Sequence, residues 1–305
     1  MIMKPYTLNL IISGDFSLNT IYTSSQMYSY FLAKHFCNLK HITVKKILTS
    51  QLTDIPTAQF SLIHALLSEL SIDYHKISVA TSIKTASFLE IAISQIDLNF
   101  TYVKKDNSIL INAPIEKSLY TNVAKENKSI LLDHAWRAHF KGNPNIDSEF
   151  DWTFKILNVL EKLKDKYKIY KLFRSDEQLE WYEKYPWITI IKQSNFNDYL
   201  SNIKNKEIFI STHCGSYNST VVDMLAFGSK VIIPQVYYTP LKVIVPFIPQ
   251  YNIDLFQLPI VESIEQLIDE IKKPIDQNNW NKKINYCTDM IDAVNIIDNE
   301  FQKYL

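Results

Sequence analysis

Short apolar runs alternate with stretches of helical periodicity along most of the chain. Continuous apolar runs of a few residues predict strands, whereas apolar residues repeated every three or four positions predict helices. In the first part of the chain the predicted strands are Thr7–Ser13, His41–Leu48, His75–Ala80, Phe100–Lys104 and Ile109–Ile111, and the predicted helices are Ser24–Phe36, Phe60–Ser71 and Ile83–Ile96.

The alternation starts again after a polar stretch at Asn122–Lys128. We place a domain boundary there, which predicts one domain at residues 1–127 and a second at 128–305. In the second part the predicted strands are Ser129–Asp133, Tyr167–Phe173, Trp187–Ile191, Glu207–Ser211 and Lys230–Pro234, and the predicted helices are Trp152–Lys164, Phe196–Ile203, Ser219–Phe227, Ile264–Ile271 and Asn279–Leu305.

Strands and helices that alternate with short links form parallel sheets with helices on both faces. Two such series in one chain predict an α/β protein with two Rossmann-like domains that face a cleft. Ligands of these sheets bind at the carboxyl ends of the strands. Candidate functional residues are therefore expected in the loops that follow predicted strands.

Composition narrows the classes of protein. The chain has 305 residues, 47% of them apolar, with 32 basic and 32 acidic residues, so a generally basic nucleic-acid binder is not expected. Three well-separated cysteines without a CxxC pair fit a reducing compartment. The N-terminus is typical of a first strand, and no run approaches the roughly 20 apolar residues of a membrane span. We expect a cytoplasmic protein, with peripheral contact at the inner face of the membrane left open.

The segment 207–235, EIFISTHCGSYNSTVVDMLAFGSKVIIPQ, is the most informative one. A strand ends in small polar residues, a helix starts near Ser219, and Gly228 ends that helix. Unpaired amides at a helix N-terminus attract phosphate, and Asp223 lies one turn further, within reach of ribose hydroxyls. Simple capping of the helix by these polar residues is the alternative. The candidate ligands of a nucleotide here are Thr212, His213, Gly215, Ser216, Ser219, Thr220 and Asp223.

This segment resembles the donor-binding strand–loop–helix of GT-B glycosyltransferases. The runs 213–215 (HCG) and 218–220 (NST) are similar to the HCG-x-NST part of a nucleotide-sugar signature, and Asp223 and Gly228 match its acidic residue and following glycine in spacing. The chain departs from that signature by two inserted residues and by Asp in place of Glu. The resemblance thus implies the fold and a nucleotide-sugar donor, UDP- or CMP-linked, without fixing the base.

The loop after Ser129–Asp133 gathers His134, Arg137 and Lys141. The resemblance implies that Arg137 and Lys141 neutralise the donor diphosphate, whose charge grows as the sugar leaves. Arg137 and Arg174 are the only arginines in a lysine-rich chain, which favours a need for the planar, bidentate guanidinium. A surface salt bridge is the alternative, and for Arg174, which follows another predicted strand, the two readings are balanced.

Asp15, after the first predicted strand, is the candidate general base for an acceptor hydroxyl, and His134 is a second acid–base candidate. Capping of a turn is the alternative for Asp15. The chain has no GxxxxGK[ST], GxGxxG after a strand, HExxH or GxSxG, which argues against P-loop, dinucleotide, zincin and α/β-hydrolase chemistry. We expect neither a metal nor a separate cofactor.

Three functions remain on these grounds. The first is a glycosyltransferase that moves a sugar from a nucleotide donor to a glycan or lipid-linked acceptor, as in bacterial surface polysaccharide or lipooligosaccharide synthesis. The second is a sugar-nucleotide epimerase of the same fold, which needs no acceptor. The third is a non-catalytic nucleotide-binding partner of a transferase.

Overall fold

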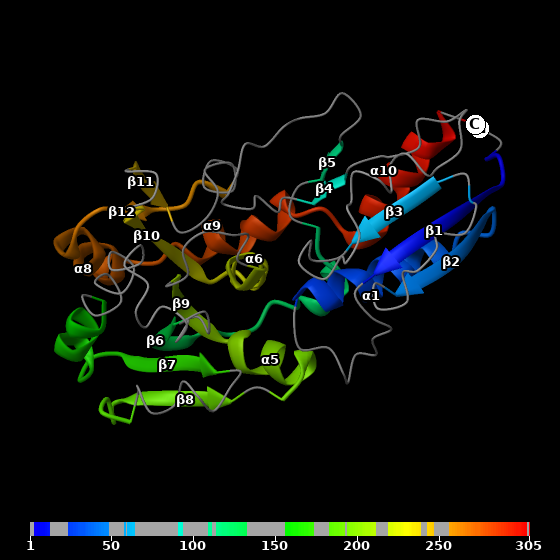
Figure 1. Ribbon diagram of the computed structural model, residues 1–305. Helices are drawn as coiled ribbons and strands as arrows, with labels where there is room; N and C mark the ends of the chain where they lie inside the picture. Colours follow the sequence, from blue (N-terminus) through cyan, green and yellow to red (C-terminus); the bar gives the residue numbers. More distant parts are fainter. Residues whose placement is uncertain are drawn as a thin grey trace.

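In the computed structural model, the residues whose placement is described are 3–12, 24–48, 58, 60–64, 91–93, 109–111, 114–132, 156–173, 183–192, 194–211, 219–238, 243–246, 256–303 and 305. They form an α/β fold with two larger sheets, both mainly parallel, and a separate pair of short parallel strands (Figure 1).

The first sheet has β1 (Tyr6–Ile12) at its centre, between β2 (Ile42–Leu48) and β3 (Phe60–His64), and both pairings are parallel. The predicted helix between the first two strands is confirmed as α1 (Ser24–Cys37). Leu8, Asn9 and Leu10 of β1 are all fully buried, so both faces of this strand are covered. Burial on both faces is typical of a central parallel strand, and here it extends to the polar Asn9.

Two predictions in the first part are wrong. The helix predicted at Phe60–Ser71 begins as strand β3, and the helix predicted at Ile83–Ile96 contains β4 (Ile91–Ile93), which pairs in parallel with β5 (Ile109–Ile111). Short continuous apolar runs fit both periodicities, so spacing alone does not separate a buried strand from a helix. The strands predicted at His75–Ala80 and Phe100–Lys104 lie outside the described residues.

The second sheet follows the order β11-β10-β9-β6-β7-β8, with β12 beside β10, and only β11 is antiparallel to its neighbour. A helix lies between β6 and β7, between β8 and β9 and between β9 and β10, as predicted. Its strands are β6 (Glu126–Leu132), β7 (Lys168–Phe173), β8 (Ile188–Lys192), β9 (Lys206–Ile210), β10 (Lys230–Tyr238), β11 (Val243–Pro246) and β12 (Ile260–Val261). Its helices are residues 156–163, α5 (Phe196–Ile203), α6 (Ser219–Ala226) and α8 (Ile264–Lys272).

The end of the chain is not the single helix predicted at Asn279–Leu305. It consists of α9 (Gln277–Asn281), the 3₁₀ helix η8 (Lys282–Tyr286) and α10 (Met290–Gln302). Extended backbone at Cys287 and Asp289 separates the last two. The periodicity missed this break because apolar residues continue through it.

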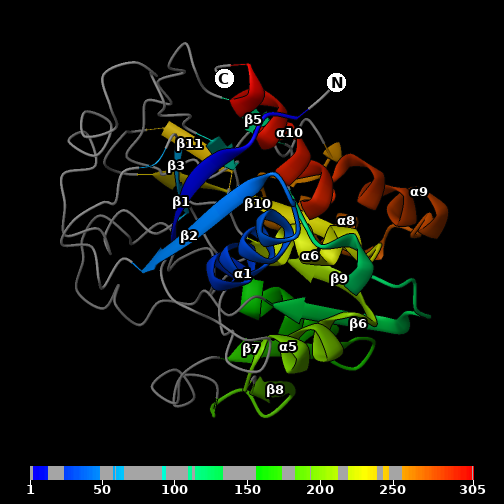
Figure 2. The same ribbon diagram turned by 90° about the vertical axis from the view of Figure 1, so that its right-hand side faces the viewer.

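Helix α10 returns to the first sheet. The Asp298 carboxylate accepts a hydrogen bond from the Tyr6 hydroxyl at 2.9 Å and contacts His41 Nε2 at 2.9 Å. Lys4 and Gln302 exchange two further hydrogen bonds, and Figure 2 shows α10 beside the start of β1. The division at residue 127 falls inside β6 and stays a prediction, but the last helix packs with the first sheet.

No helix in the described part of the chain is both long and apolar enough to cross a bilayer.

Candidate functional site

The second sheet reverses its winding direction between β6 and β9. The chain passes from β6 to β7 and β8 on one side, then returns to place β9 and β10 on the other side. In open parallel sheets, the carboxyl edge at such a switch point is where ligands bind. The edge between β6 and β9 is therefore the candidate site that topology selects.

The register brings the ends of three strands together. Leu132, the last residue of β6, pairs with Ile210 of β9 and with Lys171 of β7. Neighbouring strands lie about 4.8 Å apart, so the loops after these three strands start within roughly 10 Å of one another. The loops that the sequence selected thus begin side by side at the switch point.

Most of the predicted site residues belong to these loops and lie outside the described residues. Their positions are known only through the strand that each follows. His134, Arg137 and Lys141 follow β6; Arg174 follows β7 directly; Thr212, His213, Gly215 and Ser216 follow β9; and Asp15 follows β1. Their roles as ligands, acids or bases stay predictions.

The helix that follows β9 is present as predicted. α6 starts at Ser219 and ends at Ala226, and Thr220 and Asp223 on it are fully or almost fully buried. The first amides of a helix have no partner within the helix and carry a partial positive charge. The start of α6 is thus suited to a phosphate group at the switch-point edge.

Gly228 ends α6 as predicted, and its backbone explains the need for glycine. Its φ of +75° lies in the left-handed region, and the Ser229 amide donates to the Met224 carbonyl at 2.9 Å. This is a Schellman ending, which turns the chain sharply into β10. A Cβ at Gly228 would lie 2.2 Å from Asn281 Oδ1, so the position also lacks room for a side chain.

Asp223 has tyrosine partners that the sequence did not predict. Its carboxylate accepts hydrogen bonds from the hydroxyl of Tyr199, on α5, at 2.7 Å and from that of Tyr120, on the segment before β6. Burial, reinforced by the nearby carboxylate, raises the pKa of Tyr120 well above its usual range, which keeps this hydroxyl protonated. A ribose contact for Asp223 stays a prediction; the observed contacts anchor α6 instead.

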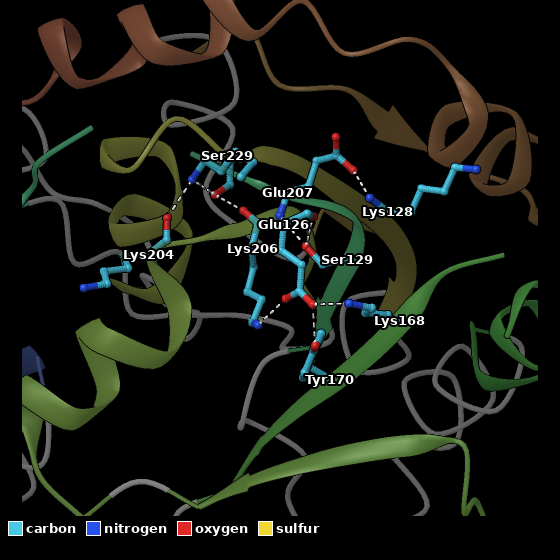
Figure 3. Close-up of polar contacts among 10 residues, drawn as sticks. Glu126, Lys128, Ser129, Lys168, Tyr170, Lys204, Lys206, Glu207 and Ser229 are labelled. Carbon is cyan, nitrogen blue, oxygen red and sulfur yellow. Dashed lines mark hydrogen bonds and ion pairs between the residues drawn. The ribbon is translucent and has the colours of Figure 1, made fainter. Parts of the chain in front are cut away.

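A second group of polar residues lies at the opposite, amino edge of the sheet (Figure 3). Glu126, at the start of β6, accepts from Lys206 at 2.7 Å, from Tyr170 at 2.8 Å and from Lys168 at 3.0 Å. These residues come from β6, β7 and β9, so the contacts join three strands. The group lies at the other end of the strands from the candidate loops and holds the starts of three strands together. We call it the amino-edge tie. In the sequence, only the charged residues at the starts of these strands pointed to it.

Among the described residues, no group of three or more His, Cys, Asp or Glu side chains is arranged to hold a metal ion.

Comparison with known proteins identifies the fold but no family. No family model matches the chain, and no curated protein matches it in sequence. A mutant O-GlcNAc transferase from Thermobaculum terrenum superposes with a TM-score of 0.52 at 6% identity, over 99% of this chain and 68% of that one. S. aureus MnaA, in a co-structure with UDP, gives 0.52 at 12% identity over 98% and 96% of the two chains.

A third similar structure is the UDP-GlcNAc 2-epimerase from Neisseria meningitidis bound to UDP-GlcNAc, with a TM-score of 0.52 at 9% identity over 97% and 99% of the two chains. At these identities the likeness establishes the fold alone. The chain has the GT-B-like α/β fold that these glycosyltransferase and epimerase structures share, which confirms the predicted fold class.

Proposed function

We propose that the protein is a GT-B glycosyltransferase, which moves a sugar from a nucleotide donor to a glycan or lipid-linked acceptor. One observation carries the proposal: the two loops richest in candidate ligands, after β6 and β9, both start at the switch-point edge of the second sheet, and the loop that begins with Arg174 follows the neighbouring strand β7. A helix N-terminus follows β9 and a loop with positively charged residues follows the neighbouring β6. Together they make this edge suited to a nucleotide diphosphate.

Each predicted residue has a defined task in this proposal. The amides at the start of α6 and the residues 212–216 before it hold the phosphates. Arg137 and Lys141 stabilise the leaving diphosphate as its charge grows, because their attraction is stronger in the transition state than in the bound donor. Asp15 or His134 accepts the proton of the attacking hydroxyl. In Figure 1, β1 and β7 point toward the middle of the molecule from opposite ends. In this proposal Asp15, which follows β1 in the sequence, is placed on the acceptor side.

An epimerase acting on a nucleotide sugar is the second candidate. The Neisseria meningitidis epimerase shares the fold over almost the whole of each chain, so the fold accommodates this activity as well as transfer. A non-catalytic nucleotide-binding partner is the third candidate. All three need the same nucleotide edge, and they differ in what happens to the sugar.

Product analysis separates these candidates. The protein is incubated with UDP- and CMP-sugars, alone and with glycan and lipid-linked acceptors, and the products are identified by mass spectrometry and NMR. A transferase forms product only with an acceptor, an epimerase changes the sugar without one, and a binding partner does neither. Formation of epimer without acceptor would overturn the transferase proposal.

Arg137 gives a test of the site itself. Arg137→Ala should lower kcat by 10²-fold or more and change donor affinity much less, because the lost charge acts mainly on the leaving group. Lys168→Ala is the matched control, since it removes a positive charge at the amino edge of the same sheet. Equal effects of the two variants on kcat would remove Arg137 from the site.

A further inference from the structure

The chain crosses between the two sheets twice, and the crossings run side by side. The first crossing is residues 114–125, before β6, and the second is residues 287–289, before α10 (Figure 1). The Ile115 amide donates to the Thr288 carbonyl at 2.9 Å, and the Met290 amide donates to the Ile115 carbonyl at 2.7 Å. These two paired segments therefore connect the parts of the described chain that carry the two sheets.

Tyr120 connects the first crossing to α6. Its hydroxyl donates to Asp223 in the middle of that helix, and its ring packs on Phe227 at 4.9 Å between centroids. Tyr120 is 6% exposed and Asp223 is 1% exposed, so water competes little for this hydrogen bond. The contact is thus a firm link between the crossing and the helix.

Cys287, on the second crossing, is buried close to the same group. Burial raises the pKa of its thiol to about 12; the charge of Lys117 acts against this rise and the charge of Asp223 adds to it. α6 also contacts η8, which ends at Tyr286 directly before the second crossing, so both crossings adjoin this helix. α6 is the helix whose first turn lies at the proposed nucleotide edge.

We propose that Tyr120 is a positioning residue that couples nucleotide binding at the start of α6 to the relative placement of the two sheets. The inference rests on the proposed function and adds a route from the donor site to closure of the two halves. A nucleotide at the first turn of α6 would shift or stiffen that helix, and the Asp223–Tyr120 contact would pass this change to the crossing. Closure of this kind excludes water and aligns an acceptor.

Tyr199 provides a matched control. It donates to the same carboxylate from a site of equal burial, but it lies on α5, within the second sheet's own layer of helices. Tyr120→Phe and Tyr199→Phe each remove one buried hydroxyl and keep the ring. Both variants should lower the melting temperature by a similar few degrees, roughly 2–5 °C. Only the first breaks the link to the crossing.

The experiment measures UDP and CMP binding by calorimetry and the change in radius of gyration on binding by small-angle scattering. In the wild type and in Tyr199→Phe, the bound nucleotide should compact the protein. In Tyr120→Phe, the nucleotide should bind within about threefold of wild-type affinity, but the compaction should be lost. With the nucleotide sugar as donor, kcat should fall and the KM for the donor should be unchanged.

Equal loss of compaction in both variants, or none in either, would overturn the coupling and reduce Tyr120 to a packing residue. Nucleotide binding without any compaction of the wild type would overturn it too, while the proposed function would stand. Absence of binding by either nucleotide would count against the nucleotide edge itself and against the coupling with it.

Discussion

The replacement Glu126→Gln should destabilise the fold in a pH-dependent way. Burial by itself raises the pKa of Glu126, but hydrogen bonds from Lys206, Lys168 and Tyr170 outweigh that effect and hold the pKa at about 2, below its ordinary 4.5. Each pKa unit corresponds to about 1.36 kcal/mol, so the full difference would be worth about 3 kcal/mol. The side chain is 19% exposed and its partner Lys168 is 68% exposed, so screening lowers the expected loss to about 2 kcal/mol.

The sign of the pH dependence follows from the lowered pKa. The folded state holds its proton less tightly than the unfolded state, so the stabilisation is complete above about pH 4.5 and disappears as the pH falls toward 2. Urea unfolding of both proteins from pH 7 to pH 3 tests this. The difference in unfolding free energy should shrink to under half of its pH 7 value at about pH 3.

The exposed pair of Glu161 and Lys164, with side chains 53% and 39% exposed, supplies the control. Glu161→Gln should cost no more than about 0.5 kcal/mol at any pH, because a surface pair is screened and flexible. A loss at Glu126 that is as small as this, or one that stays constant down to pH 3, would refute the account of the amino-edge tie.

Two further predictions concern the packing of single residues. Gly228→Ala should lower the unfolding free energy by about 2 kcal/mol or more, because φ is +75° and the new Cβ meets Asn281. The double variant with Asn281→Gly should recover part of this loss. A urea midpoint of Gly228→Ala equal to that of the wild type would contradict the prediction. Asp298→Asn weakens the contacts to Tyr6 and His41 and should lower the unfolding free energy by about 2 kcal/mol. Amide hydrogen exchange should become faster throughout α10. Faster exchange in the last turn alone would show that other contacts hold the helix.

The sequence predicts those elements whose local signals agree. In α5, Phe196, Tyr199, Leu200 and Ile203 form one buried stripe, and the Asn195 side chain accepts a hydrogen bond from the Asp198 amide as an N-cap. The cap sets the start of the helix, and the buried stripe continues to its last residue, Ile203. For α6, the predicted start at Ser219 and the ending at Gly228 were right, and the positive φ of Gly228 explains the ending.

Long-range partners were beyond sequence reasoning. Asp223 and Tyr120 are 103 positions apart, and no local pattern announces their contact. The charge on Glu126 was visible, but its partners Lys206 and Lys168 are set by strand order, which a single sequence does not give. The switch point could be inferred only in part, because alternation of strands and helices predicts parallel sheets without fixing which strands are neighbours.

Hydrogen–deuterium exchange with and without saturating UDP or CMP tests the central claim most directly. The account predicts slower exchange in peptides that cover 133–142 and 212–220, at the carboxyl edge of β6 and β9. Peptides at the amino edge, 126–129 and 206–208, should exchange unchanged. Protection at the amino edge alone, or unaltered exchange at the carboxyl edge with nucleotide bound, would contradict it.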